Sequence, residues 1–216
     1  QFAAILSVVV IYRKAFFNFK DYRFYLKLGL AVIPALLFGA LLKKYIDAVL
    51  DNLWVIATVM VLGGIALIFI DRYFKKQVAS VDQQPIQFKQ AFWVGCFQVL
   101  AILFPGLSRS AATIIGGLSQ KLSKKAAAEF SFFLAVPTML AASAKSTLDV
   151  YQDHPEVFVS ENLINLCIGG IVAFFVALVS VKFFIQFVQK RGFSLFGWYR
   201  IALGLTMLAW LYLQKA

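Results

Sequence analysis

Residues 91–118 read AFWVGCFQVLAILFPGLSRSAATIIGGL, an apolar segment with one charged side chain, that of Arg109. Pro105-Gly106 interrupts the segment near its centre. A Pro-Gly pair is a strong turn signal, so the segment is predicted to form two helices joined by a tight turn. An arginine near a bilayer interior is unfavourable unless a polar or anionic group meets it, which makes Arg109 a candidate functional residue.

The composition of the chain is that of an integral membrane protein. Of its 216 residues, 62% are hydrophobic and 14% are charged, whereas soluble domains carry about 25% charged residues. The apolar residues form unbroken runs and do not alternate with polar ones, which favours spanning helices over a β-barrel. The predicted fold is therefore an all-α polytopic helical bundle. The apolar runs cover residues 2–12, 28–42, 53–70, 126–144, 163–181 and 195–213.

The formal net charge of +11 arises from short basic clusters between the apolar runs. Cytoplasmic loops of membrane proteins are enriched in lysine and arginine, so this charge indicates orientation and not nucleic-acid binding. The basic cluster 121–125 then belongs on the inside of the membrane. The other loops are assigned in the same way, with 13–27, 71–90 and 182–194 inside and 43–52 and 145–162 outside.

Residues 91–118 must therefore enter and leave the membrane on one side. The segment has 28 residues, and two full crossings would need about 40. It is predicted to be a re-entrant helix-loop-helix hairpin within a single transmembrane domain, 1–216. Three spanning helices follow the hairpin in 91–216, and three lie in 1–90, so the halves are expected to form an inverted repeat. The first half lacks a hairpin, and its first apolar run begins directly after Gln1, so further sequence upstream is expected.

The turn and the helix start after it offer groups that bind phosphate. Ser108 or Ser110 can cap the second helix, whose first N–H groups and positive dipole end suit an anion. Arg109 adds a planar guanidinium able to bind phosphate in a bidentate manner, and Thr113 adds a hydroxyl. These residues predict a phosphate site inside the membrane. The alternative interpretation is a serine-capped helix whose arginine reaches to an interface.

Four stretches of this sequence resemble one known family. They are Gly95-Cys96-Phe97-Gln98, residues 105–114 (PGLSRSAATI), residues 128–137 (AEFSFFLAVP) and the pair Tyr199-Arg200. Together they are similar to the undecaprenyl-diphosphate phosphatases of the bacitracin-resistance type, and the likeness extends over essentially the whole chain. The Pro-Gly-x-Ser-Arg-Ser motif joined to Glu-Phe-Ser-Phe is a specific signal.

The resemblance implies an enzyme of the bacterial inner membrane that removes one phosphate from C55 polyprenyl diphosphate and regenerates the carrier lipid of cell-wall synthesis. It also implies an inverted repeat with two re-entrant hairpins and a divalent cation, Mg or Ca. The expected partners are the lipid substrate and the bilayer, and a homodimer is left open. The resemblance assigns catalysis to Arg109, Ser108 and Ser110, and substrate binding to these three together with Thr113, Gln98 and Glu129.

One family feature is absent from this sequence. The family has a first motif, rich in glutamates and ending in Pro-x-Ser-Ser-x-x-His, whose glutamates would hold the cation, and no stretch here matches it. The chain is therefore expected to contain about half of an active site, without metal ligands, and to be unable to turn over alone. His154, the one histidine, lies in the acidic outer loop and is not expected to be catalytic.

Two interpretations stay open at this point. A transporter or flippase for a phosphorylated lipid or a small anion would use the same broken helices, and a binder without activity would need no first motif. Arg200 lies five residues into its apolar run and is interpreted as an arginine that extends to the inner surface, with a role in the site as the alternative.

Overall fold

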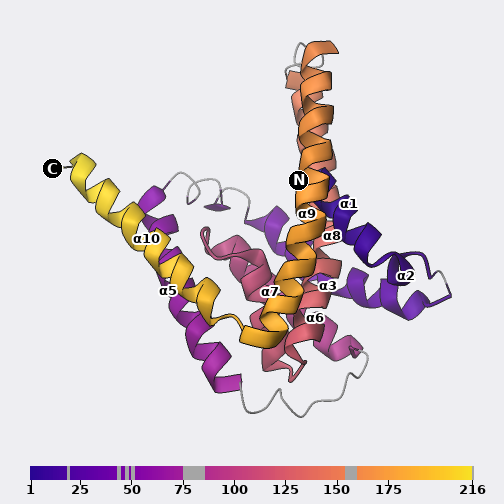
Figure 1. Ribbon diagram of the computed structural model, residues 1–216, viewed down its shortest axis with the longest axis horizontal. Coiled ribbons are helices and arrows are strands. Elements are labelled where there is room, and N and C mark those ends of the chain that lie inside the picture. Colours follow the sequence, from indigo (N-terminus) through magenta and orange to yellow (C-terminus); the bar gives the residue numbers. More distant parts are fainter. Residues whose placement is uncertain are drawn as a thin grey trace.

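The computed structural model describes residues 1–18, 20–42, 45–46, 49, 52–74, 86–153 and 160–215. Regular structure in these ranges is helical, with no strand among them (Figure 1), so the all-α prediction is confirmed. The helices are α1 (Phe2–Ile11), α2 (Arg13–Phe16), α3 (Tyr22–Leu41), α5 (Leu53–Phe74), α6 (Phe88–Leu103), α7 (Arg109–Ser119), α8 (Lys124–Asp153), α9 (Ser160–Arg191) and α10 (Ser194–Lys215).

Within the described residues, five helices are long and apolar enough to cross a membrane. A spanning helix needs about 20 apolar residues, because a helix rises about 1.5 Å per residue and the hydrocarbon core is about 30 Å thick. The prediction of a polytopic membrane protein is therefore confirmed. The candidate spans are Tyr22–Leu41, Leu53–Tyr73, Lys124–Asp153, Asn162–Arg191 and Ser194–Gln214.

Helices α6 and α7 form the helical hairpin that the Pro-Gly turn predicts. Their far ends are tied together, because the side-chain Nε2 of Gln90 donates a hydrogen bond to the carbonyl of Gln120 over 3.0 Å. The helices pack closely, and a Cβ atom added to Gly116 would lie 2.7 Å from Cβ of Phe97. Both ends of the hairpin thus lie on one side of the protein. That this side is one face of the membrane stays a prediction.

The hairpin is held by buried contacts on both of its helices. Helix α6 lies against α3, where Gly95 lets its backbone contact that of Ala31. Helix α7 buries Ile114 and Leu118 almost completely, in a cluster with Leu67 of α5 and other residues. Close-packed interiors resist displacement, so the turn between the helices is placed with little freedom.

Helices α5 and α10 lie side by side (Figure 1) and touch through glycines. A Cβ atom on Gly64 would lie 2.6 Å from the carbonyl oxygen of Gly197, and one on Gly197 would lie 2.7 Å from that of Gly64. The two helices are therefore in close backbone contact at these glycines. The glycines of α9 differ, because a Cβ on Gly169 or Gly170 would meet no atom within 4 Å.

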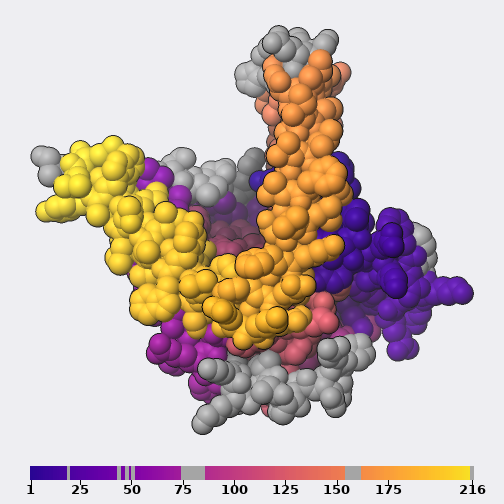
Figure 2. All heavy atoms as spheres, viewed as in Figure 1, coloured from indigo at the N-terminus to yellow at the C-terminus, as the bar shows by residue number. Residues whose placement is uncertain are grey.

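Helix α7 of the hairpin lies between the α5–α10 pair and the α8–α9 pair (Figure 1). Figure 2 shows that the surface is hollowed between α10 and α9. The hollow opens toward the C-terminal end of α10, which the charge pattern assigns to the outer side of the membrane.

Candidate active site

The break in residues 91–118 is a tight turn closed by a hydrogen bond from the N–H of Leu107 to the carbonyl of Phe104 over 2.9 Å. Pro105 and Gly106 occupy its central positions, and Gly106 has φ +96°, as the third residue of a type II turn does. A Cβ on Gly106 would also lie 2.5 Å from the carbonyl oxygen of Ile56 in α5. The turn therefore requires glycine for its backbone conformation and for its contact with α5.

Helix α7 begins at the turn with a serine cap, as predicted. Ser108 is the N-cap residue, and its Oγ accepts a hydrogen bond from the N–H of Ala111 over 3.3 Å. The N–H of Ala112 donates to the carbonyl of Ser108 over 2.9 Å and so starts the helical ladder. The N–H groups of Arg109 and Ser110 precede that ladder and have no acceptor within the helix. These N–H groups and the positive end of the helix dipole would favour an anion at this position.

The guanidinium of Arg109 lies against α8. Its Nη1 donates to Oγ1 of Thr138 over 2.7 Å, and its Nη2 contacts Sδ of Met139 at 3.1 Å. Both partners are neutral, and no described carboxylate forms an ion pair with this guanidinium. The charge of Arg109 is thus uncompensated within the described protein. Thr138 and Met139 were not candidates from the sequence, where only Pro137 beside them belongs to a motif.

The guanidinium of Arg200 reaches the turn from α10. Its Nη2 donates to the carbonyl of Gly106, and its Nε is buried without a partner among the described residues. The contact depends on the glycines of α5, since a Cβ on Gly63 would lie 3.2 Å from Nη2 of Arg200. The interpretation of Arg200 as an arginine that extends to the inner surface is therefore wrong. Close α5–α10 packing directs it to the hairpin.

Arg200, Ser108 and Ser110 line a common cavity of about 220 Å³, together with Tyr199 and apolar side chains of α5, α7, α9 and α10. Arg109 is not part of this lining, because its side chain lies on the α8 side of the same helix start. The structure thus places the two serines and Arg200 on one side of the α7 terminus and Arg109 on the other.

Thr113 and Gln98 are both buried, and neither lines that cavity. Oγ1 of Thr113 lies 2.7 Å from Oγ of Ser131 in α8 and donates to the carbonyls of Arg109 and Ser110 at 3.0 and 3.1 Å. This hydroxyl therefore joins α7 to α8. Gln98 lies in α6 with its side-chain oxygen buried and without a partner among the described residues.

Glu129 lies apart from Arg109. It is nine residues before Thr138 in α8, a separation of about 14 Å along a helix. Its Oε1 accepts a hydrogen bond from the hydroxyl of Tyr12 over 3.3 Å.

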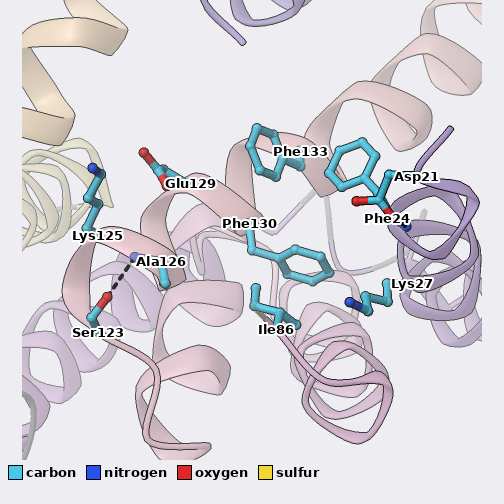
Figure 3. Close-up of a pocket in the computed structure, with 10 residues that line it drawn as sticks. All are labelled: Asp21, Phe24, Lys27, Ile86, Ser123, Lys125, Ala126, Glu129, Phe130 and Phe133. Atoms are coloured by element: carbon cyan, nitrogen blue, oxygen red, sulfur yellow. Dashed lines mark hydrogen bonds between the residues drawn. The ribbon is translucent and has the colours of Figure 1, made fainter. Parts of the chain in front are cut away.

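Glu129 lines a different cavity, of about 350 Å³. Figure 3 shows Glu129 and Lys125 at one end of this cavity and Lys27 at the other, with the ring of Phe130 between them. The structure therefore does not bring Glu129 together with the serines and the arginines of the hairpin turn.

The described residues do not fit a divalent cation. No group of three or more His, Cys, Asp or Glu side chains in that part of the chain could hold a metal ion. The site consists of cations, hydroxyls and backbone N–H groups, which bind anions. His154 lies outside the described residues.

Comparisons with known proteins agree over nearly the whole chain. Residues 1–206 match the family model described as bacitracin resistance protein BacA. The chain is 49% identical to an undecaprenyl-diphosphatase of Porphyromonas gingivalis, over 94% of this chain and 77% of that protein. It is 48% identical to one of Flavobacterium johnsoniae, with 96% and 77% covered, and 42% identical to one of Enterococcus faecalis, with 96% and 78% covered. The chain therefore belongs to the bacitracin resistance protein BacA family.

Proposed function

We propose that this protein removes one phosphate from undecaprenyl diphosphate in the bacterial inner membrane, and that the start of α7 holds the diphosphate. Membership of the BacA family and the names of the relatives support the reaction. The observation that supports the location is the pair of arginines, Arg109 and Arg200, which approach one helix start from two sides without a described acidic partner.

The groups around the turn suit the chemistry of phosphoryl transfer. That reaction depends on positioning and on electrostatic stabilisation of the phosphate oxygens. Arg109 would exchange its neutral partners, Thr138 and Met139, for phosphate oxygens, which a guanidinium binds more strongly. The N–H groups of Arg109 and Ser110 and the hydroxyl of Ser110 would donate further hydrogen bonds. In this proposal Ser108 keeps its role as the cap of α7.

The proposal assigns Arg200 a positioning role. By binding the carbonyl of Gly106, it fixes the turn that orients the first N–H groups of α7. Thr113 has a comparable role on the other side, through Ser131. Glu129 is left out of the site, because it lies about two and a half turns from Thr138 along α8.

The divalent cation that the family leads us to expect has no ligand set among the described residues. The described residues of the site supply the groups that bind and orient the diphosphate.

We also propose that residues 1–216 form one transmembrane domain with an inverted repeat, 1–90 and 91–216, in which α6–α7 is re-entrant. The reciprocal contact of Gly64 and Gly197 supports a two-fold relation between α5 and α10, the last helices of the two halves. The hydrogen bond between Gln90 and Gln120 holds the two ends of the hairpin together, which supports a hairpin that enters and leaves the membrane on one side. In this arrangement the turn faces the outer half of the membrane.

The function is tested with the protein produced from its own gene, purified and supplied with undecaprenyl diphosphate. Phosphate release is measured for the wild type, for Arg109→Ala and for Arg13→Ala, which changes an exposed arginine of α2. We expect Arg109→Ala to lower the rate by about a hundredfold or more, and Arg13→Ala to retain it. Unchanged hydrolysis in Arg109→Ala contradicts the proposed site. Lipid transfer across vesicles without phosphate release by the wild type would identify a carrier instead.

A further inference from the structure

A second strongly charged cavity, of about 420 Å³, lies where four helices begin or end. We propose that this basic cavity binds the phosphate headgroup of an anionic phospholipid of the bilayer. Its residues come from the end of α5, the start of α8, the end of α9 and the start of α10. They are Asp71, Arg72, Lys124, Lys190, Arg191 and Ser194.

The acidic residue of the basic cavity is already satisfied by protein groups. Asp71 is 6% exposed, and its Oδ1 accepts a hydrogen bond from Nζ of Lys124 over 2.6 Å. Its Oδ2 accepts one from Oγ of Ser194 over 2.7 Å. The Asp71–Lys124 pair is the one salt bridge within the described ranges. The cavity therefore retains the charges of Arg72, Lys190 and Arg191, none of which has a described acidic partner.

The backbone fixes these cations in relation to one another. Gly192 links α9 to α10 with φ +77°, and a Cβ on it would lie 2.5 Å from both carboxylate oxygens of Asp71. The same atom would lie 2.7 Å from Nζ of Lys124. The chain thus reverses directly against the Asp71–Lys124 pair. Lys190 and Arg191, which precede Gly192, are consequently held at the end of α5 beside Arg72.

The position of the basic cavity is that of the lipid headgroups. Two candidate spans, ending at Tyr73 and Arg191, terminate at the cavity, and two others, beginning at Lys124 and Ser194, start there. In Figure 1 the end of α9 and the start of α10 lie together in the lower part of the molecule. Phosphates of the bilayer lie at this depth, and anionic lipids attract basic clusters at helix ends.

Apolar side chains on the neighbouring turns favour a lipid over free phosphate. Phe69 of α5, Phe183 of α9 and Leu195 of α10 are 68%, 63% and 59% exposed. They lie within two turns of the cavity residues and provide a surface for acyl chains. Ser194 precedes Arg200 by six residues, about 9 Å along α10. The basic cavity is therefore separate from the hairpin turn.

Native mass spectrometry of the purified chain, released from micelles containing phosphatidylglycerol and phosphatidylethanolamine, tests the proposal. The test variant is Arg72→Gln/Lys190→Gln/Arg191→Gln, which leaves the Asp71–Lys124 pair intact. The control is Arg13→Gln/Lys14→Gln/Lys20→Gln, which removes the same charge from an exposed segment on the same predicted side. We expect phosphatidylglycerol retention to fall about tenfold in the test variant, and to stay near wild type in the control.

Equal losses in both triple variants overturn the proposal, because the basic residues would then act only as a general positive surface. No loss in either variant also overturns it, because the cavity residues would then not hold the lipid. Displacement of phosphatidylglycerol by inorganic phosphate at equal concentration overturns it in favour of a free-anion site. Displacement by polyprenyl monophosphate at a lower concentration than phosphatidylglycerol overturns it in favour of the carrier lipid. If the test variant does not fold, Lys190→Gln and Arg191→Gln are measured singly, and each is expected to weaken retention.

Discussion

The guanidinium of Arg200 in α10 donates a hydrogen bond to the carbonyl of Gly106, 94 residues earlier in the chain, at the turn between α6 and α7. This contact joins the last helix to the helix start that carries Ser108, Arg109 and Ser110. A half-buried arginine that donates to a turn carbonyl helps to fix the direction of the following N–H groups. The geometry of the candidate site is therefore set partly by α10.

Replacing Arg200 by glutamine should weaken both folding and ligand binding. The carbonyl of Gly106, which is partly buried, loses a hydrogen bond from a charged donor, which costs about 1.5–3 kcal/mol in the free energy of unfolding. We expect binding of a polyprenyl diphosphate to weaken as well, because the turn is no longer held. Arg200→Lys keeps the charge but offers a compact ammonium, and it should recover only part of the loss. Thermal unfolding and lipid binding are measured together, and a variant with wild-type values in both contradicts the positioning role.

Gly64→Ala should destabilise the protein by about 1–3 kcal/mol, because the added methyl group meets a backbone carbonyl that cannot yield freely. The ideal Cβ position lies 2.6 Å from the carbonyl oxygen of Gly197. Gly169→Ala, in α9, is the matched control, since a Cβ there meets no atom within 4 Å. Its unfolding temperature in detergent should equal or exceed that of the wild type. Equal effects of the two substitutions would show that α5–α10 contact does not limit stability.

Thr113→Val separates a structural role from direct binding. The hydroxyl of Thr113 is enclosed between α7 and Oγ of Ser131, so its removal should cost about 1–3 kcal/mol of stability. We expect the affinity for polyprenyl diphosphate, measured below the unfolding temperature, to change by less than the effect of Arg109→Ala. Thr147→Val, which removes an exposed hydroxyl bonded to its own helix at Ser143, should be nearly neutral. A Thr113→Val variant of wild-type stability that no longer binds lipid would place this hydroxyl on the ligand instead.

Binding of polyprenyl diphosphate to the purified chain should be insensitive to a chelator. Its described residues supply anion-binding groups at the start of α7, and no group of three or more His, Cys, Asp or Glu side chains among them could hold a divalent cation. The affinity is measured with and without the chelator. A loss of affinity on chelation would contradict the proposal that these residues hold the diphosphate.

Much of the hairpin could be predicted from the sequence because its causes are local. Pro105-Gly106 determines the turn, and Ser108 caps the helix that follows. The loop charges placed both ends of the segment on one side, which agrees with the contact between Gln90 and Gln120.

The surroundings of the site could not be predicted in this way. Arg109 meets Thr138 across 29 residues and Arg200 meets Gly106 across 94. These contacts follow from how whole helices pack, and the α5–α10 contact depends on Gly63 and Gly64, whose partners no local pattern identifies. The position of Glu129 could not be predicted either, because membership of a motif does not determine how far along a long helix a residue lies from the hairpin turn; its substrate-binding role stays a prediction.

The affinity of the purified chain for undecaprenyl diphosphate, compared between wild type and Arg109→Ala, tests the central claim most directly. Arg13→Ala serves as the charge-matched control, and unfolding temperatures show that all three proteins are folded. Charge-assisted hydrogen bonds contribute about 1.5–3 kcal/mol, so we expect binding to weaken by at least about tenfold in Arg109→Ala and to stay unchanged in Arg13→Ala. Wild-type affinity in a folded Arg109→Ala variant would contradict the claim that the start of α7 holds the diphosphate.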